Sequence, residues 1–432
     1  MGRESLVLEV DSLTAAALLG RLHTLTGVRL AVAATFRHPT PRRLAHHLHQ
    51  ELTGSAEPEQ RPDLHVELDL DIRPAAASRR AGTECLVTGA TGFVGAFLVR
   101  ELADRGRKVH CLVRGADPAT ARRRLRTAMD AYDLWDDELE HLVQVHPGDL
   151  SQPLLGLTAT AFDQLAAAVG TIYHSGAHVS AVHPYSALQT ANIGGTQEAL
   201  RLAASGNPST FHHISTIEVF AERPLHGGPI TPADPPGPPD ALRGGYAQTK
   251  WAAEYLVRQA GHRGLPTTIH RLPRIVGHTR TGACQTRDLL WQVLKGCIQA
   301  GAVPAGIDAD YDLMPVDLVA RAIADAAPGA GAVLHLTNLH RTSFAIIVEY
   351  LRSLGYPLAD LSLDAWTDLI RTQPGNAAGP VVEIFRTEMA GQGWSDLIFA
   401  STLPHCPPLG SEIFTTYVDY FARTGYLPKP PH

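Results

Sequence analysis

Apolar and polar positions along most of the chain follow two alternating periods. Short apolar runs bounded by polar residues predict strands at 84–88, 109–113, 142–146, 171–174, 210–214, 267–271 and 333–336. Longer stretches with apolar residues at helical spacing predict helices at 94–105, 118–131, 185–204 and 246–262. Each predicted helix is about long enough to connect one parallel strand to the next. This order predicts an α/β fold built on a doubly wound parallel sheet.

The two ends of the chain have other patterns, which predict further units. Residues 1–52 predict a small helical segment, with a break at 36–41 where Pro41 starts the next helix. Residues 53–80 are rich in proline, glutamate and alanine and predict a linker that includes a short strand at 64–70. We expect the main domain at 81–280, with 311–340 returning to it, and a smaller, mostly helical substrate-binding lobe at 281–310 and 341–432. Five prolines in 231–240 predict an irregular loop over a cleft.

Composition narrows the class of protein. Of the 432 residues, 44% are hydrophobic and 19% are charged, which is typical of a globular protein. The net charge of −6 provides no overall basic field, so we expect no nucleic-acid partner. Arg, His, Asp or Pro interrupts each apolar run before the ~18 residues that a membrane span needs. We therefore expect a soluble protein that has no membrane partner.

Cysteine usage and the absence of common motifs narrow the class further. The five cysteines are scattered without a CxxC pair, and the N-terminus lacks the layout of a signal peptide, so we expect a reduced, cytoplasmic location. The sequence has no HExxH and no Cys/His spacing typical of metal sites, so we expect no metal. It also lacks the Gly-x-Ser-x-Gly of serine hydrolases.

A glycine-rich loop connects the first strand of the main domain to its first helix. Glycines at this junction permit a tight turn and let backbone N–H groups approach a pyrophosphate, and the helix N-terminus adds partial positive charge. We therefore expect a dinucleotide to bind at this loop, through Gly89, Thr91, Gly92, Phe93, Val94 and Gly95.

An arginine ends the second strand, at the position where an NAD-binding site usually carries an acid. Arg114 suits a ribose 2′-phosphate, because a guanidinium can bind phosphate through two hydrogen bonds. The following helix carries further arginines, of which we expect Arg124 to contact the same phosphate. The sequence therefore predicts NADPH as the cofactor.

A tyrosine and a lysine stand four residues apart at the start of a later helix. This spacing puts Tyr246 and Lys250 on one helix face, downstream of a strand that ends in Ser215 and Thr216. We expect the ammonium of Lys250 to lower the pKa of Tyr246 from ~10 and to hold nearby ribose hydroxyls. The sequence predicts a catalytic pair at this position.

Taken in order, these motifs resemble the extended short-chain dehydrogenase/reductase family. The resemblance rests on the glycine loop, the Asn-Ile-Gly-Gly-Thr of 192–196, the Ser-Thr strand end and the Tyr-x-x-x-Lys. Within that family, several motifs over about 64–400 resemble the terminal thioester reductase (R) domains of nonribosomal peptide and polyketide synthases and of carboxylic acid reductases. They lie at 112–115, 148–153, 173–177, 245–254, 274–282 and 314–317.

This resemblance implies a Rossmann fold and a reductive activity. NADPH would reduce a carrier-bound acyl or peptidyl thioester, the small-molecule substrate, to an aldehyde, with further reduction to the alcohol left open. By position, Tyr246 would donate a hydrogen bond or proton to the developing oxyanion, and Thr216 would supply a second donor. Lys250 would tune the phenol and orient the nicotinamide ribose.

The resemblance also implies contacts with the rest of the cofactor. Asp149 and Leu150 would lie beside the adenine, and Ser175, Gly176 and Ala177 would pass under the cofactor. Asn192 would support the geometry of the active site, with hydrogen bonding inside its own helix as the alternative.

Two further groups of residues are expected to surround the substrate. Arg271, Pro273 and Arg274 follow a strand and would flank the substrate channel or the nicotinamide. Trp366 and Phe385, in the hydrophobic cap, would bind the acyl chain, with ordinary core packing as the alternative.

The N-terminal segment resembles the latter part of a peptidyl or acyl carrier domain. In that family the serine of an Asp-Ser-Leu motif carries 4′-phosphopantetheine, and here the motif is Asp11, Ser12 and Leu13. Val10 stands where the family usually has glycine, and only ten residues precede Asp11, so we expect a partial carrier unit. A carrier protein of a synthase is the implied partner.

Other functions stay open on the sequence alone. An extended short-chain reductase or epimerase acting on a nucleotide sugar or a free aldehyde would share the glycine loop and the Tyr-x-x-x-Lys. A protein that only senses NADP, or serves as a scaffold, would keep the dinucleotide loop without needing Thr216, Tyr246 and Lys250. Release by a cyclising condensation without redox chemistry is a third alternative, disfavoured because Tyr246 is present.

Overall fold

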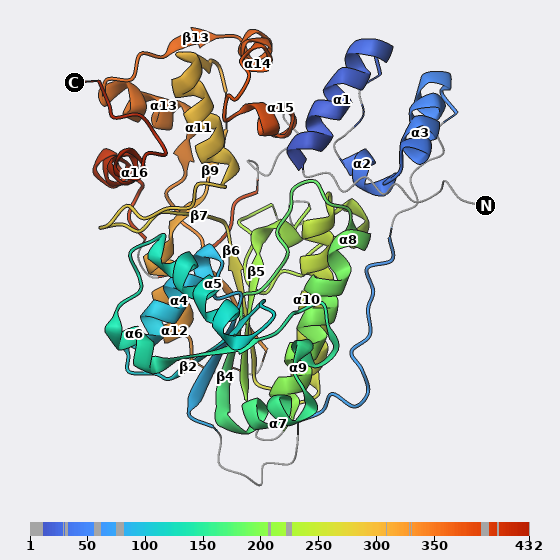
Figure 1. Ribbon diagram of the computed structural model, residues 1–432, viewed down its shortest axis with the longest axis vertical. Coiled ribbons are helices and arrows are strands. Elements are labelled where there is room, and N and C mark those ends of the chain that lie inside the picture. Colours follow the sequence, from blue (N-terminus) through green and yellow to red (C-terminus); the bar gives the residue numbers. More distant parts are fainter. Residues whose placement is uncertain are drawn as a thin grey trace.

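A seven-stranded parallel sheet forms the centre of the molecule (Figure 1). In this computed structural model, the described residues are 12–28, 30, 33–55, 62–74, 82–205, 209–221, 227–307, 309–327, 329, 331–389, 397–403 and 406–431. The strands, in order across the sheet, are β11 (Ala332–His335), β6 (Thr267–Leu272), β5 (Thr210–Thr216), β4 (Val169–His174), β1 (Glu84–Thr88), β2 (Val109–Val113) and β3 (Val143–Pro147). All neighbouring pairs are parallel, which confirms the predicted doubly wound Rossmann-like sheet.

Helices cover both faces of the sheet because its strands carry apolar side chains on both faces. In β1, Cys85 and Val87 pack into one core and Leu86 into the other. The first core contains side chains of α4 (Phe93–Asp104), α5 (Pro118–Asp130), α6 (Asp137–Leu142) and α12 (Val316–Asp325). The second contains side chains of α7 (Ala159–Ala168), α9 (Gly195–Ala204) and α10 (Gly245–His262).

The predicted helix at 185–204 is interrupted in the structure. It consists of α8 (Tyr185–Gln189), a π-helical turn (Thr190–Gly194) and α9. Such turns widen the helix by one residue and often occur at functional sites. Here the π turn contains Asn192, whose side chain is almost fully buried.

A second, mostly helical lobe lies beyond the carboxyl ends of the sheet strands (Figure 1). Its helices are α11 (Leu289–Ala300), α13 (Phe344–Ser353), α14 (Leu363–Thr372), α15 (Val382–Met389) and α16 (Ser411–Arg423). Short strand pairs accompany them: β7 (Arg274–Val276) with β10 (Leu313–Pro315), β8 (Ala302–Pro304) with β13 (Ala359–Leu361), and β9 (Asp310–Tyr311) with β12 (Thr342–Ser343).

Two aromatic side chains of this lobe were expected to bind an acyl chain. Trp366 and Phe385 are both completely buried, and their ring centroids lie 5.6 Å apart. The indole Nε1 of Trp366 donates to the carbonyl of Ala302 at 3.1 Å. The structure therefore favours core packing, the alternative interpretation of these residues.

Three helices form a separate N-terminal unit beside the sheet and the lobe (Figure 1). They are α1 (Ser12–Thr26), α2 (Ala33–Arg37) and α3 (Pro41–Thr53), and they share a small core of Leu19, Ala34 and Leu44. Thr40 caps α3, since its side chain accepts from the N–H of Arg43 at 3.3 Å. The start of α3 at Pro41 is confirmed, but α2 extends to Arg37, so the break between the helices is shorter than the predicted 36–41.

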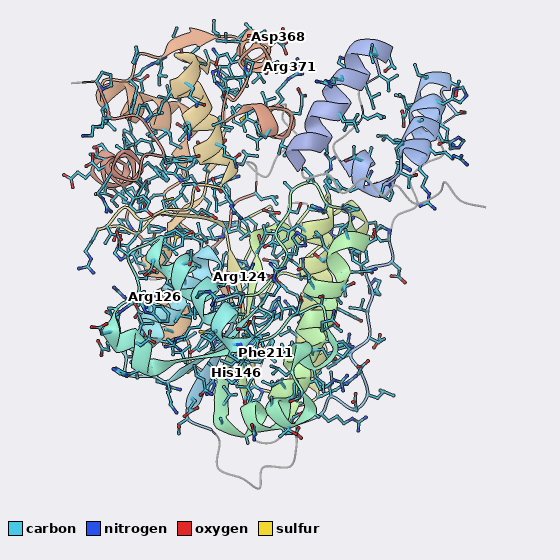
Figure 2. All side chains as sticks on the ribbon, viewed as in Figure 1. Arg124, Arg126, His146, Phe211, Asp368 and Arg371 are labelled. Carbon is cyan, nitrogen blue, oxygen red and sulfur yellow. The ribbon has the colours of Figure 1, made fainter. Side chains whose placement is uncertain are left out.

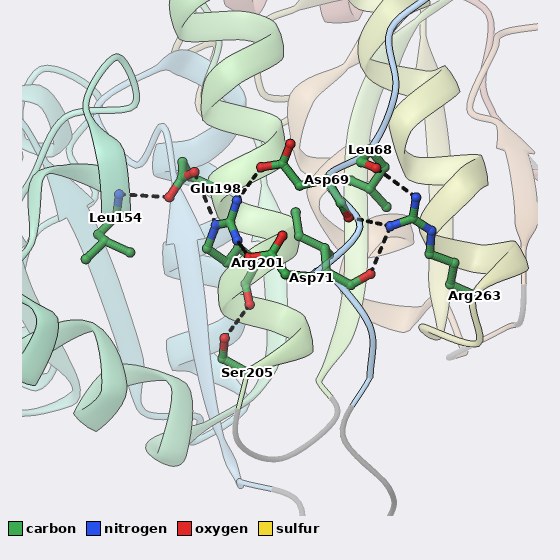
Figure 3. A network of polar contacts seen from close by, with 9 residues as sticks. Leu68, Asp69, Asp71, Leu154, Glu198, Arg201, Ser205 and Arg263 are labelled. Atoms are coloured by element: carbon green, nitrogen blue, oxygen red, sulfur yellow. Dashed lines mark hydrogen bonds and ion pairs between the residues drawn. The ribbon is translucent and has the colours of Figure 1, made fainter.

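The linker prediction holds in part, because residues 62–74 pack against the main domain without forming the expected strand at 64–70. The backbone of Leu68 bonds to side chains of α10: its N–H donates to Gln259 at 3.0 Å, and its carbonyl accepts from Arg263 at 2.7 Å. Arg201 of α9 pairs with Asp69 and Asp71 (Figure 3). Side chains therefore bond backbone groups that a neighbouring strand would otherwise pair.

The described residues contain no disulfide and no helix suited to crossing a membrane. All five cysteines are free thiols, and Cys85 and Cys111 are buried in β1 and β2, as the apolar pattern predicted. Among the helices of the described residues, none combines the length and apolar character that crossing a membrane requires.

Candidate active site

The glycine loop after β1 has the geometry of a dinucleotide cradle. Gly89 has a φ of 72°, which favours glycine, and a Cβ there would lie 2.6 Å from the backbone nitrogen of Gly176. A Cβ on Gly95 would lie 2.1 Å from the carbonyl oxygen of Gly89. Gly92 caps α4 without any side-chain hydrogen bond, so the helix starts with backbone N–H groups available to an anion. The loop therefore fits a pyrophosphate.

The other predicted residues of this loop differ in how they are placed. Thr91 and Val94 are half-buried at the helix start. The side chain of Phe93 packs into the first core against Phe97 and Tyr132, at centroid distances of 5.4 and 5.3 Å. Only the backbone of Phe93 can therefore face a bound cofactor.

The two arginines predicted to bind a 2′-phosphate are exposed, Arg114 directly after β2 and Arg124 on α5. Burial raises the pKa of Asp149, but hydrogen bonds from Ser151 and the charge of Arg114 outweigh burial and hold that pKa below its ordinary value. This influence places the Arg114 guanidinium near Asp149, at the ends of β2 and β3.

On α5, the neighbours of Arg124 have partners in the protein. Arg122, Arg123 and Arg126 contact Glu140, Thr120 and Asp130 respectively. Arg124 is exposed, and no hydrogen bond or ion pair joins it to another residue that the structure describes (Figure 2). Of these four arginines, it is therefore the one most available to an anionic ligand.

A buried chain of hydrogen bonds connects the cofactor loops with the π turn. The N–H of Gly176 donates to Thr88 Oγ1 at 3.1 Å, and Thr88 Oγ1 contacts His174 Nδ1 at 2.8 Å. His174 Nε2 contacts Thr196 Oγ1 at 3.0 Å, and Thr196 donates to the carbonyl of Asn192 at 2.6 Å. Because Thr196 uses its only proton on Asn192, His174 Nε2 must be the donor and its Nδ1 the acceptor.

Burial keeps this histidine neutral. It lowers the pKa of His174 to about 3, and the nearby charge of Lys250 acts in the same direction. A neutral ring of one fixed tautomer can hold the 175–177 loop in place. Ser175 and Ala177 are half-buried, whereas Gly176 is buried, and a Cβ on Gly176 would approach Leu150 to 2.6 Å.

The amide of Asn192 contacts protein groups with both of its polar atoms. Its Oδ1 accepts from the N–H of His178 at 2.6 Å, and its Nδ2 donates to the His178 carbonyl at 3.1 Å and to Thr249 Oγ1 at 3.0 Å. These bonds tie the loop after β4 to α10. They support the expected structural role of Asn192, while its direct contact with a cofactor stays a prediction.

The three predicted catalytic residues lie on elements that pack together: Thr216 ends β5, just before the turn η3 (Ile217–Val219), and Tyr246 and Lys250 lie on α10. The Oγ1 of Thr216 accepts from the N–H of Glu218 at 3.2 Å, which leaves the hydroxyl proton to be donated. Lys250 is buried, and its Nζ donates to the carbonyl of Ile214 at 2.7 Å. Tyr246 stands one helical turn before Lys250.

One electrostatic expectation for this site is wrong. Lys250 was expected to lower the pKa of Tyr246, but burial and the charge of Glu218 raise it instead. Burial also lowers the pKa of Lys250 itself, to about 8, against the opposing charge of Glu254. The phenol therefore stays protonated at neutral pH and is a donor rather than a phenolate.

A buried ion pair between Arg271 and Glu254 lies next to the candidate site, and none of the motifs identified in the sequence predicts it. Arg271 was expected to flank the substrate channel, but it is completely buried in β6 and makes two bonds to Glu254, at 3.0 and 2.8 Å. Ser215 also donates to Glu254, at 2.7 Å. Arg274 lies outside this cluster and pairs with Asp288. The four-residue spacing of Lys250 and Glu254 was the available signal.

The predicted phosphopantetheine site lies at the edge of the described residues. Ser12 is the first residue of α1, and Val10 and Asp11 lie outside the described residues. The unit contacts the main domain through Phe36 of α2, whose ring centroid lies 4.2 Å from that of His183.

Two family models match the chain. The model described as "Male sterility protein" (NAD_binding_4) matches residues 87–323, and the model described as "Phosphopantetheine attachment site" matches residues 6–48. The first covers the sheet from the end of β1 to β6, without β11, and includes the candidate catalytic residues. The second covers the N-terminal helical unit.

Curated relatives are much longer than this chain. It is 37% identical over 360 residues to a component of the linear gramicidin synthase of Brevibacillus parabrevis, a match that covers 79% of this chain and 7% of the relative. It is 35% identical over 389 residues to glycine betaine reductase ATRR of Emericella nidulans, covering 84% and 31% respectively. The chain therefore spans less than a third of the length of these relatives.

Solved structures share the fold. The terminal R domain from the myxalamid PKS-NRPS pathway has a TM-score of 0.77 and 34% identity, covering 84% of this chain and 97% of that domain. A thiolation-reductase di-domain from an archaeal non-ribosomal peptide synthetase has a TM-score of 0.72 at 22% identity and covers 98% of this chain and 95% of its own. The second likeness shows the fold alone, including the N-terminal unit.

Proposed function

Because this chain belongs to the family of terminal thioester reductase domains, an extended short-chain dehydrogenase/reductase family, and carries a carrier-protein segment, we propose that it releases a thioester reductively. The substrate is an acyl or peptidyl chain on the phosphopantetheine thiol of a carrier protein. The product is an aldehyde, with further reduction to the alcohol as a second step. The relatives are named as synthases and reductases, in line with such a reaction.

NADPH, when bound, supplies the hydride for the carbonyl carbon. The residues that would hold it are those of the glycine loop, whose backbone N–H groups suit a pyrophosphate. Arg114, directly after β2, and Arg124, on α5, are exposed cations that suit a ribose 2′-phosphate, so we propose a preference for NADPH over NADH. Asp149, Leu150 and the 175–177 loop would line the remaining length of the cofactor site.

Tyr246 and Thr216 would stabilise the negative charge that develops on the thioester oxygen. The raised pKa keeps the Tyr246 phenol protonated, so it can donate its proton to that oxygen. Thr216 retains a hydroxyl proton for a second hydrogen bond. Two donors directed at one oxygen are the arrangement that lowers the barrier of an acyl reduction.

Lys250 would act as a fixed cation behind the two donors. Its ammonium donates to the Ile214 carbonyl, which fixes the side chain along the strand end. An ammonium has three protons, so it can also donate toward a ribose hydroxyl. The resulting hemithioacetal expels the pantetheine thiol, which leaves more readily than an alkoxide, and the aldehyde forms.

The remaining parts of the chain would hold the substrate and its carrier. We propose that the lobe of residues 281–310 and 341–432 holds the acyl or peptidyl chain, and that the domain of 81–280 with 311–340 holds the cofactor. We further propose that the N-terminal unit presents a thioester on Ser12, and that the protein works in the cytoplasm.

The observation that supports this proposal is the packing of α10, with Tyr246 and Lys250, against β5, which ends in Thr216, in a chain whose loop after β1 fits a dinucleotide. The test follows NADPH oxidation at 340 nm with a series of acyl-pantetheine thioesters, with NADH as the cofactor control. Mass spectrometry identifies the products. We expect thioester-dependent oxidation that yields aldehyde or alcohol together with free thiol.

Two other outcomes would each replace the proposal with a different function. Oxidation with nucleotide sugars or free aldehydes, but with no thioester, would favour the reductase or epimerase alternative. NADPH binding without turnover of any of these substrates would favour the sensing or scaffold alternative.

A further inference from the structure

A buried histidine contacts the candidate catalytic lysine, and neither the motifs nor the proposed mechanism gives it a role. His213 lies in β5, three residues before Thr216, and is completely buried. Its Nε2 lies 3.2 Å from the Nζ of Lys250. A second contact of the same Nζ, to the carbonyl of Ile214, comes from the same strand at 2.7 Å.

Strand geometry explains why this side chain reaches the site. Alternate residues of a strand face opposite sides, so His213 shares a face with Phe211, which packs in the core under α10 (Figure 2). Ser215, on the same face, donates to Glu254 of α10. His212 faces the other side, where its Nδ1 contacts His270 Nε2 at 3.0 Å.

The hydrogen-bond chemistry fixes the state of the ring. An ammonium can only donate, so His213 Nε2 must accept, and the neutral ring carries its proton on Nδ1. Burial lowers the pKa of His213 far below its ordinary value, and the charge of Lys250 and the neighbouring His174 and His270 act in the same direction. The Nδ1 atom is buried and has no hydrogen-bond partner among the described residues.

The buried Nδ1–H of His213, unpaired among the residues that the structure describes, is unfavourable in free energy, so an interaction elsewhere on the ring must offset it. Buried polar atoms nearly always have partners, and an unpaired buried N–H is unfavourable. The Nδ1–H of His213 has no partner among the described residues, and the hydrogen bond that the ring makes is the one from Lys250 to its Nε2. A histidine placed only for packing would gain nothing over phenylalanine at this position.

We propose that His213 is a positioning residue of the active site, whose Nε2 lone pair fixes the direction of the Lys250 ammonium. With Ile214 and His213 each accepting one proton, the ammonium has one N–H left to direct toward the ligand side. The relevance of this to turnover rests on the proposed function, whereas the contact itself can be tested without any substrate.

The charged groups around this pair are few. Lys250 and Glu254 lie on α10, and Arg271 of β6 is bonded to Glu254. His174 on β4 faces His213, with ring centroids 5.6 Å apart, whereas His270 of β6 contacts His212 on the opposite face of the sheet. Both histidines are held neutral by burial, so Glu254 is the charged group that stabilises the lysine cation, while Ile214 and His213 accept its protons.

The test measures the titration of Lys250 directly, in the full chain. The sequence has only four lysines, so isotope-labelled lysine gives four side-chain NMR signals, and the signal absent from Lys250→Arg identifies Lys250. We expect Lys250 to titrate near pH 8 in the unaltered chain. In His213→Phe, loss of the acceptor should lower that midpoint by about one unit or more.

Matched variants separate the lone pair from the packing of the ring. His213→Gln and His213→Met have side chains of similar length, and only glutamine offers an acceptor. We expect glutamine to keep the midpoint near that of the unaltered chain and methionine to lower it as phenylalanine does. His212→Phe, on the opposite face of the same strand, should leave the Lys250 midpoint unchanged.

Kinetics then connect the contact with catalysis. In the methionine and phenylalanine variants the loss of kcat with rising pH should begin at a lower pH than in the unaltered chain, because Lys250 loses its charge earlier. The KM for the thioester should change little. Equal Lys250 midpoints in the glutamine and methionine variants would overturn the proposal, whatever the enzyme does to thioesters. A chain that turns over no thioester but shows the expected NMR shifts would overturn the proposed function alone.

Discussion

Two side chains in the candidate site have their protonation set by burial. Burial and the charge of Glu218 raise the pKa of the half-buried Tyr246, which stays a neutral phenol, and burial lowers the pKa of Lys250 to about 8. A phenol that can donate its proton and a lysine ammonium with a lowered pKa suit a reaction in which negative charge appears on a carbonyl oxygen.

Removal of the phenol hydroxyl tests this role. We expect Tyr246→Phe to lower kcat by about 10²-fold or more, since an oxyanion donor is lost. NADPH binding, followed by its fluorescence, should stay near normal because the glycine loop is untouched. Unchanged turnover in this variant would remove Tyr246 from the mechanism.

Cofactor selectivity belongs to two exposed arginines. We expect Arg114→Ala to weaken NADPH binding by roughly 10-fold or more, the usual worth of a charged hydrogen bond, and NADH binding by less than about 2-fold. Arg124→Ala should act in the same direction. Isothermal titration with both nucleotides measures the ratio.

Arg123→Ala is the matched control on α5, because Arg123 already bonds to Thr120. It should leave both affinities unchanged. Equal losses for NADPH and NADH in the Arg114 variant would contradict the phosphate role.

At the residue scale, the sequence predicted which side chains meet but not their electrostatics. The Tyr-x-x-x-Lys spacing and the Ser-Thr strand end predicted a site between α10 and the end of β5, and these two elements do pack together. The raised pKa of Tyr246 was missed, since desolvation depends on what packs around a group. The contact of His213 was missed for a related reason: a histidine in an apolar strand has no spacing rule that links it to a distant helix.

At the scale of elements, the junction of β1 and α4 depends on close backbone approach. A Cβ on Gly95 would lie 2.1 Å from the Gly89 carbonyl oxygen, and backbone cannot give way as a flexible side chain can. We expect Gly95→Ala to distort the loop, destabilise the fold by on the order of 1–3 kcal/mol and weaken NADPH binding at least about 10-fold. Urea unfolding and nucleotide titration measure the two effects.

A second glycine provides the control for this element. Gly194 lies in the π turn, and a Cβ there would meet nothing within 4 Å. Gly194→Ala should leave both stability and NADPH affinity nearly unchanged. If Gly194→Ala and Gly95→Ala reduced stability and NADPH affinity to a similar extent, the close backbone contact at Gly95 would not be the cause of those losses.

Most elements could be predicted from periodicity, and the exceptions have local causes. The strands at 84–88 and 109–113 have the predicted bounds, because their apolar runs end sharply at glycine and polar residues. The strand expected at 64–70 is wrong, since Gln259 and Arg263 bond to the backbone that a partner strand would need. The helix at 185–204 was correct in extent, but its π turn leaves no mark in the hydrophobic pattern.

At the scale of the whole molecule, the sheet interior is unusually rich in neutral histidines. Burial lowers the pKa of His146, His212 and His335 to about 4 and of His174 to about 3, and it holds the pKa values of His213 and His270 well below their ordinary value. The unfolded chain takes up these protons below pH ~6.5, whereas the folded chain does not until about pH 4. Stability should therefore decrease as pH falls between these values.

The expected effect is large because several groups act together. Each such histidine costs about 1.4 kcal/mol per pH unit in this window, so the urea midpoint should fall clearly between pH 7 and pH 5. His146→Gln should reduce the pH dependence of the unfolding free energy by about one proton. A midpoint independent of pH between 7 and 5 would contradict the neutral state of these rings.

The central claim is that this chain reduces a thioester with hydride from NADPH. The most direct measurement uses NADPH deuterated at the transferred position, an acyl-pantetheine thioester and mass spectrometry of the product. We expect one free thiol per substrate consumed, with one deuterium on the former carbonyl carbon of an aldehyde or two on that of an alcohol. Release of the thiol without deuterium in the product would contradict the account.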